Sequence, residues 1–153
     1  MDTDMYLLKN PSQILKNKDL VFSIQDPDVI ISTSFIAAEP NQAFIKNAVS
    51  LYEKIHYEKG NNKPNTEILS LLIFKIYHFN HLDKTQSIGK ITAYDSNILL
   101  QPSFKTIALH IGEKTWAPHT KHDQLRIQMR QHIKNQFAAG LFRIVNDIFR
   151  KLV

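Results

Sequence analysis

Hydrophobic and polar positions divide the chain into short apolar segments separated by turn-forming residues. Runs rich in apolar and β-branched residues predict strands over residues 20–24, 29–36, 88–93, 98–100 and 106–110. Apolar positions that recur every three or four residues predict helices over residues 40–55 and 67–79, and a start signal at residues 10 and 11 predicts a short helix over residues 10–17. Because strands and helices alternate along the chain, we expect a mixed α/β fold.

Polar residues and prolines mark where these helices are expected to begin. Asn10 is placed to cap the first helix, with Pro11 at the first helical position, where its missing N–H removes no hydrogen bond. Pro40 is expected in the first turn of the second helix. Asn65 or Thr66 is expected to cap the third helix.

The region after residue 118 carries one continuous amphipathic pattern. Apolar residues recur at three- and four-residue steps from Leu125 to Leu152, which predicts a helix of about eight turns. Gly140 is the expected weak point, because glycine is a poor helix former. We therefore expect a domain over residues 1–118, followed by a basic amphipathic helical tail over residues 119–153.

Composition limits the class of protein. The chain has 153 residues, 43% of them hydrophobic, and no cysteine, so it forms no disulfide and suits a reducing cytoplasmic compartment. The acidic start argues against a secretory signal, and no apolar run reaches the roughly 20 residues of a spanning helix. The formal charge is +5, and the residues from Lys121 onward carry seven basic and two acidic side chains, which is 7 − 2 = +5.

The first candidate for chemistry is the acidic pair at the start of the chain. In an extended segment, side chains two residues apart leave the same face, so Asp2 and Asp4 can converge on one cation. Carboxylate oxygens are ligands that Mg²⁺ and Mn²⁺ prefer. A solvated turn is the alternative, because aspartate also favours turns.

Three segments of the chain, taken in order, resemble one family of enzymes. Asp2 to Pro11 resembles the aspartate-x-aspartate (DXD) strand of retaining glycosyltransferases of the family 32 type, which includes initiating mannosyltransferases and capsular polysaccharide and lipopolysaccharide transferases. Ile31 to Pro40 resembles the small-residue segment that leads into a long helix in that family. His110 to Trp116 resembles its closing histidine and tryptophan. Together the three segments cover residues 1 to about 118.

The resemblance implies a metal-dependent transferase. Such an enzyme moves a hexose from a nucleotide-diphosphate sugar to a saccharide or lipid-linked saccharide acceptor, in surface polysaccharide or glycolipid synthesis, with Mn²⁺ or Mg²⁺ as cofactor. By resemblance, Asp2 meets the donor sugar or ribose and shares the metal, Asp4 and His110 meet the metal and the diphosphate, and Trp116 covers the pocket. A core position is the alternative for both His110 and Trp116. No catalytic nucleophile or base is singled out.

Four further residues are implied as contacts for the donor or the acceptor. Ser34 belongs to the segment that faces the sugar in the resembled family, and Glu39 would touch an acceptor hydroxyl. Asn65 and Thr66 stand where the family places donor contacts at a helix entrance. Each has a structural alternative, since Ser34 also suits the polar side of a strand and the other three suit helix starts.

The chain departs from the resembled family in two places. In the family, the DXD motif lies mid-domain, after a Rossmann-like half that holds the base and ribose of the donor, whereas this chain starts at the motif. We therefore expect a partial GT-A (nucleotide-sugar transferase) fold that lacks the N-terminal half and is inactive alone. Thr33 stands near a position where relatives often carry asparagine, which affects the expected acceptor contacts.

A non-enzymatic basic module that binds nucleic acid or a protein partner is the alternative function. In that case the tail would supply nonspecific phosphate contacts, although it carries no recognisable nucleic-acid motif. In a transferase, the same basic amphipathic tail would lie on an anionic membrane. We therefore expect a cytoplasmic protein with peripheral contact to the inner face of the membrane through residues 121–153.

Overall fold

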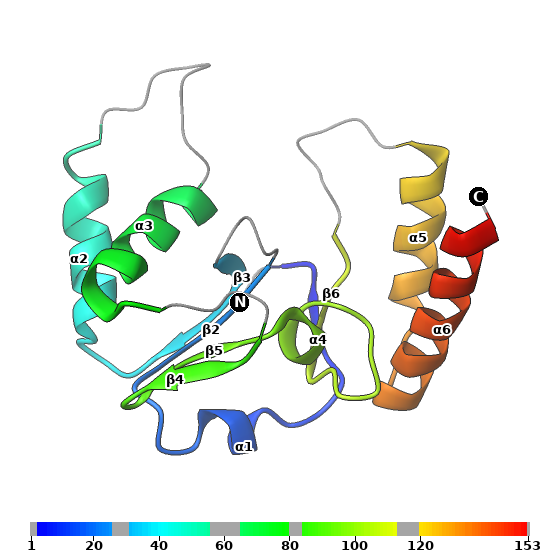
Figure 1. The fold of residues 1–153 in the computed structure, drawn as a ribbon, viewed down its shortest axis with the longest axis horizontal. Coiled ribbons are helices and arrows are strands. Elements are labelled where there is room, and N and C mark those ends of the chain that lie inside the picture. The colour runs from blue at the N-terminus through cyan, green and yellow to red at the C-terminus, as the bar shows by residue number, and fades with distance from the viewer. Residues whose placement is uncertain (1–2, 26–30, 56–64, 80–83, 113–119, 153) are drawn as a thin grey trace. The chain divides into compact units, whose positions relative to one another are not determined.

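The fold is described by a computed structural model that covers residues 3–25, 31–55, 65–79, 84–112 and 120–152 (Figure 1). It contains both helices and strands, so the mixed α/β class is confirmed. The chain forms two compact units. The first spans Ile14–Ser96, and the second joins Asp2–Gln13 to Asn97–Val153. The residues expected to form a tail therefore share a unit with the start of the chain.

The first unit is built on a mixed four-stranded sheet of order β3-β2-β5-β4. Its strands are β2 (Leu20–Ser23), β3 (Ser32–Ala38), β4 (Gln86–Ile88) and β5 (Ile91–Tyr94). The pairing of β2 with β5 is parallel, whereas the two outer pairings are antiparallel. All four residues of β2 are buried, as expected for a strand with neighbours on both sides.

Two helices complete the core of the first unit. They are α2 (Ala43–Tyr52) and α3 (Asn65–Tyr77), which lie side by side (Figure 1). Each buries one apolar stripe, which agrees with the spacing in the sequence. Their buried residues join those of the sheet in one cluster that includes Phe22, Phe44, Leu69, Ile73 and Phe79.

The second unit pairs the beginning of the chain with a strand from its last third. Strand β1 (Met5–Leu7) runs antiparallel to β6 (Ala108–His110), and Met5 lies opposite His110. Two helices pack with this pair, α5 (Lys121–Gln131) and α6 (Gln136–Leu152). One hydrophobic cluster of the unit contains Leu109, Ile111, Ile133 and Ala139, with Leu8, Ile127, Ala138 and Phe142 around it. No helix in the described part of the chain is long and apolar enough to cross a membrane.

The expected helix starts are partly confirmed. Asn10 caps the short helix α1 (Ser12–Leu15), because its side-chain oxygen accepts a hydrogen bond from the Ser12 N–H at 2.9 Å. Helix α3 begins at Asn65, so Asn65 and Thr66, which were expected to cap it, lie in its first turn instead. The prediction for Pro40 was wrong, because a turn comes first and α2 begins only at Ala43. The Gln42 side chain caps it by accepting from the N–H of Phe44.

Two of the strand predictions were also wrong. Residues 98–100 belong mainly to a one-turn helix, α4 (Ser96–Leu99), because hydroxyl groups of the following turn bind the carbonyl of Asn97. Residues 88–93 are not one strand but parts of β4 and β5, which form a hairpin. Gly89 makes the hairpin turn with a φ of +56°, which glycine adopts without strain.

The tail is two helices rather than one. Helix α5 ends at Gln131 and α6 starts at Gln136, so the break lies at residues 132–135 and not at Gly140. Asn135 explains the break, since its side-chain oxygen accepts from the Ala138 N–H at 2.9 Å, as an N-cap does. Gly140 lies inside α6, where it is buried.

Candidate functional site

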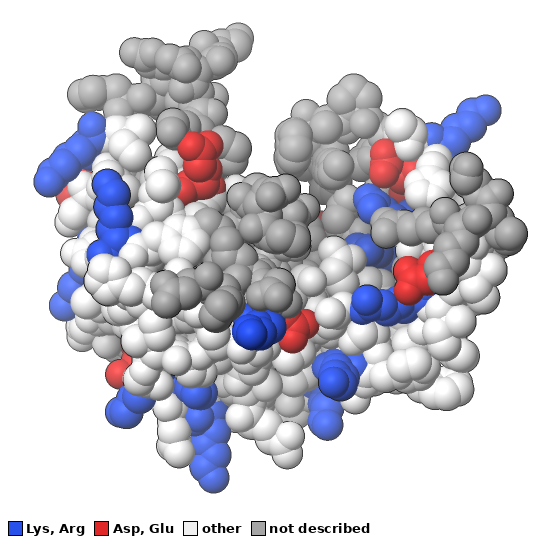
Figure 2. Space-filling view, in the orientation of Figure 1, with Lys and Arg blue, Asp and Glu red and all other residues white. Residues whose placement is uncertain are grey.

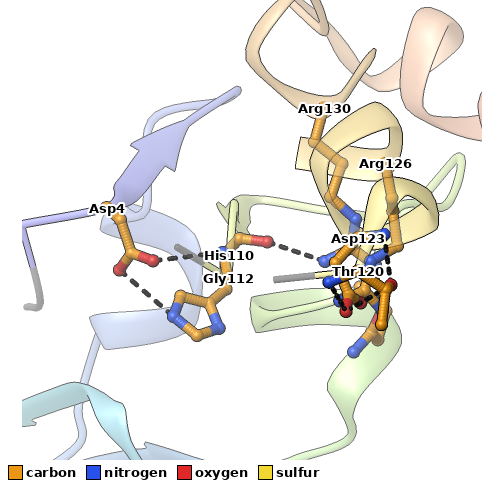
Figure 3. A network of polar contacts seen from close by, with 8 residues as sticks. Asp4, His110, Gly112, Thr120, Asp123, Arg126 and Arg130 are labelled. Carbon is orange, nitrogen blue, oxygen red and sulfur yellow. Dashed lines mark hydrogen bonds and ion pairs between the residues drawn. The ribbon is translucent and has the colours of Figure 1, made fainter. Parts of the chain in front are cut away.

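The pairing of β1 with β6 brings together two of the predicted metal ligands. Asp4 immediately precedes β1, and His110 is the last residue of β6. The strand pairing continues past them, because the backbone carbonyl of Asp4 accepts from the Ile111 N–H at 3.0 Å. Two side chains that are far apart in the sequence therefore lie at one end of the same strand pair (Figure 3).

The Asp4 carboxylate contacts the side chain of His110 and the backbone of Gly112. Its Oδ1 lies 3.1 Å from Nε2 of His110, and its Oδ2 accepts from the backbone N–H of Gly112 at 3.1 Å (Figure 3). Gly112 has a φ of +81°, a backbone conformation that favours glycine. The Asp4 side chain is 14% exposed and that of His110 28%, so both retain some surface for a ligand.

A buried arginine supports the His110 side of this pair. Arg130 of α5 is 7% exposed and donates from Nη1 to the backbone carbonyl of His110 at 2.9 Å and from Nη2 to Oε1 of Gln101 at 2.7 Å. From the sequence, Arg130 is expected only as part of the basic tail. A signal was present, because Arg130 lies three residues from both Ile127 and Ile133, which face the core.

The beginning of α5 forms a second set of polar contacts in the same view (Figure 3). Thr120 and Asp123 make a capping box, in which each side chain accepts from the backbone N–H of the other. The Arg126 guanidinium lies 3.3 Å from the Asp123 carboxylate. This arrangement fixes the start of α5, the helix that carries Arg130.

The basic residues of the tail are thus partly used within the fold. Arg130 is buried, Arg126 pairs with Asp123, and the Arg143 guanidinium lies 3.7 Å from the Asp147 carboxylate. On the face shown in Figure 2, lysine and arginine side chains are spread out with acidic side chains among them. Within neither unit do the described residues on this face gather into a single basic patch of the kind that a nucleic-acid surface usually has.

The chemistry of the Asp4 and His110 side chains fits a divalent cation in part. The described residues contain no group of three or more His, Cys, Asp or Glu side chains that could hold a metal ion. One carboxylate and one imidazole nevertheless suit a site in which substrate phosphates supply further ligands. The pair fits Mn²⁺ better than Mg²⁺, because imidazole nitrogen prefers transition metals.

The four further residues that were predicted to contact the donor or the acceptor all belong to the first unit. Ser34 is buried within β3, and its backbone N–H donates to Oγ of Ser32 at 3.2 Å. Glu39 follows β3 and is exposed, and its backbone N–H donates to the Asp19 carbonyl at 2.9 Å. Because Gln42 caps α2, the cap expected as an alternative role of Glu39 belongs to another residue.

Asn65 and Thr66 form the first turn of α3. The side-chain oxygen of Asn65 accepts from the Tyr52 hydroxyl at 3.0 Å, which links α3 to the end of α2. The backbone carbonyl of Thr66 accepts from the Ser70 hydroxyl. Both residues thus have structural roles at the helix start, which leaves their donor contacts as a prediction.

Asp2 and Trp116 lie outside the described residues, so their predicted roles stay predictions. Within the described part, the structure brings together one pair from the predicted site, Asp4 and His110. No protein-family model, curated protein or solved structure matches this chain.

Proposed function

We propose that this chain supplies the metal- and diphosphate-binding part of a retaining glycosyltransferase of the GT-A type. The enzyme would transfer a hexose from a nucleotide-diphosphate sugar to a saccharide acceptor in surface polysaccharide or glycolipid synthesis. One observation supports this above all. Asp4 and His110 come from two separate segments that resemble the family, and their side chains lie 3.1 Å apart.

In this proposal, Asp4 and His110 bind the cation together with oxygens of the donor diphosphate, and Asp2 joins them. The cation would neutralise negative charge that develops on the leaving nucleotide diphosphate. The Gly112 N–H orients the Asp4 carboxylate, and Arg130 fixes the backbone of His110. Trp116 covers the sugar, while Ser34, Glu39, Asn65 and Thr66 are further donor and acceptor contacts by resemblance.

Binding of Mn²⁺ tests the proposal directly. We expect the purified chain to bind Mn²⁺, as measured by water-proton relaxation, and the affinity to rise when UDP, GDP or CDP is added. Asp4→Asn keeps the size of the side chain but removes its charge, so it should weaken Mn²⁺ binding at least about tenfold, or about 1.4 kcal/mol. His110→Gln should weaken it in the same direction, because it removes the imidazole nitrogen.

Asp19 offers a matched control. Its carboxylate is exposed in the first unit and lies 3.5 Å from Nζ of Lys90, so Asp19→Asn removes the same charge at an ordinary surface ion pair. Mn²⁺ affinity should be unchanged in this variant. Equal affinities in Asp4→Asn and the unmodified chain would remove Asp4 from the proposed site. DNA binding without any Mn²⁺ affinity would favour the alternative, a non-enzymatic basic module.

The proposed partner of the tail is an anionic membrane surface at the inner face, where a lipid-linked acceptor would be presented. The supporting observation is a row of exposed apolar side chains along α6. These residues are Phe137, Leu141, Ile144, Val145 and Ile148. An apolar helix face with lysines and arginines nearby can lie in a membrane interface.

A further inference from the structure

A pocket lies in the second unit, between the segment that follows α4 and one side of α6. It has a volume of about 350 Å³, which is within the range of small-molecule pockets, about 300–1,000 Å³. The pocket shares no residue with the proposed metal site. Its lining consists of Asn97, Ser103, Phe104, Lys105, Gly140, Arg143, Ile144 and Asp147.

An aromatic ring forms one wall of this pocket. Phe104 packs on the backbone of α6 at Gly140, where a β-carbon would overlap the ring. The ring also contacts Phe137, with 6.2 Å between the ring centroids. Phe104 is nevertheless 51% exposed. The phenyl ring is therefore seated against a helix and still offers surface to a ligand.

Polar groups border the same pocket. The Arg143 guanidinium donates to the side-chain oxygen of Asn97 and lies 3.7 Å from the Asp147 carboxylate. The side chains of Arg143 and Asp147 are 46% and 53% exposed, so both can bind a ligand as well as each other. A guanidinium carries five N–H donors and a carboxylate about four acceptor positions, which exceeds what these contacts use. The amino group of Lys105 adds one more donor.

This combination of groups suits a sugar ring. One face of a pyranose presents C–H groups that stack on an aromatic ring, while its hydroxyls both donate and accept hydrogen bonds. A purely apolar ligand would leave the charged groups without water. A simple anion would be attracted by Arg143 and Lys105 but repelled by Asp147, whose carboxylate it could not use. A neutral polyol can use the guanidinium, the amide and the carboxylate together.

We propose that this pocket binds a pyranose unit of a saccharide, stacked on Phe104 and hydrogen-bonded to Arg143 and Asp147. Sugar binding at this pocket does not depend on the metal site. Under the proposed transferase function, the occupant is a sugar of the acceptor.

Saturation-transfer difference NMR on the full chain tests the proposal. The probes are maltose, cellobiose, lactose, mannobiose and N,N′-diacetylchitobiose. We expect transfer from the protein to the ring C–H protons of at least one of them. Phe104→Leu keeps an apolar side chain on Gly140 but removes the aromatic face, and should abolish the transfer. Asp147→Asn should weaken binding about tenfold, since hydrogen bonds to charged groups are the strong ones.

Asp4→Asn is the matched control from the metal site, and it should leave sugar binding unchanged. Conversely, Phe104→Leu should leave Mn²⁺ binding unchanged, so failure of one site is distinguishable from failure of the other. Circular dichroism confirms that each variant is folded. Transfer to none of the five sugars, or equal transfer in Phe104→Leu, overturns the proposal. Binding of inorganic phosphate without any sugar would assign the pocket to anions and also overturn it.

Discussion

Arg130 provides the sharpest test of how the proposed metal site is held. Its guanidinium is buried and donates to the His110 carbonyl and to the Gln101 side chain. Arg130→Met keeps most of the length and apolar character of the side chain but removes every donor. The variant therefore leaves the carbonyl of His110 and the amide oxygen of Gln101 without these two hydrogen bonds.

The expected cost follows from those two bonds. Hydrogen bonds that involve a charged group contribute about 1.5–3 kcal/mol each. Methionine does not have the desolvation cost of a buried guanidinium charge, which offsets part of this loss. We therefore expect Arg130→Met to lower the free energy of unfolding by about 2–4 kcal/mol. For a chain of this size, each kcal/mol lowers Tm by roughly 2–4 °C.

Urea unfolding followed by circular dichroism measures this cost. The control is Arg143→Met, because Arg143 is half-exposed and its pair with Asp147 should contribute at most about 1 kcal/mol. If Arg130→Met lowers the free energy of unfolding no more than Arg143→Met does, the two hydrogen bonds of Arg130 do not stabilise the fold as proposed. Mn²⁺ affinity gives a second readout. Under folding conditions it should fall in Arg130→Met, because His110 loses its backbone anchor, but not in Arg143→Met.

Three further results are expected. Gly140→Ala should destabilise the chain, because the new β-carbon displaces the Phe104 ring. In a Phe104→Ala background the same substitution should stabilise α6 by about 1 kcal/mol, because alanine is the better helix former. A double-mutant cycle measured by urea unfolding tests both results. Burial raises the pKa of the Tyr94 hydroxyl. The folded state thus resists its ionisation, so stability should fall as the pH rises above about 10, and less so in Tyr94→Phe. Finally, peripheral binding of the chain to anionic vesicles should fall with added salt and be lost when the residues after Gly140 are deleted. Equal binding by the deleted form would exclude the tail as the membrane-binding segment.

Some local features of this protein could be predicted from its sequence. The apolar periods located α2 and α3, because the buried face of a helix follows directly from its repeat, and the apolar run of residues 20–24 located β2. The cap of α1 at Asn10 was predicted for the same kind of reason, since an N-cap bond joins residues that are neighbours in the chain. The N-cap at Asn135 is also a local feature, but the continuous apolar stripe led to the prediction of one helix instead of two.

Other features depend on contacts between residues that are distant in the sequence. Residues 98–100 are apolar enough for a strand, and only contacts with the following turn, which Thr106 stabilises, place residues 98 and 99 in α4. Gly140 looks like a helix weakness until the Phe104 ring that it accommodates is known. The resemblance suggested Asp4 and His110, but the register of β1 with β6 decides that they touch. Burial of Arg130 likewise requires the packed second unit, because its spacing from Ile127 and Ile133 does not by itself decide whether the core encloses its charge.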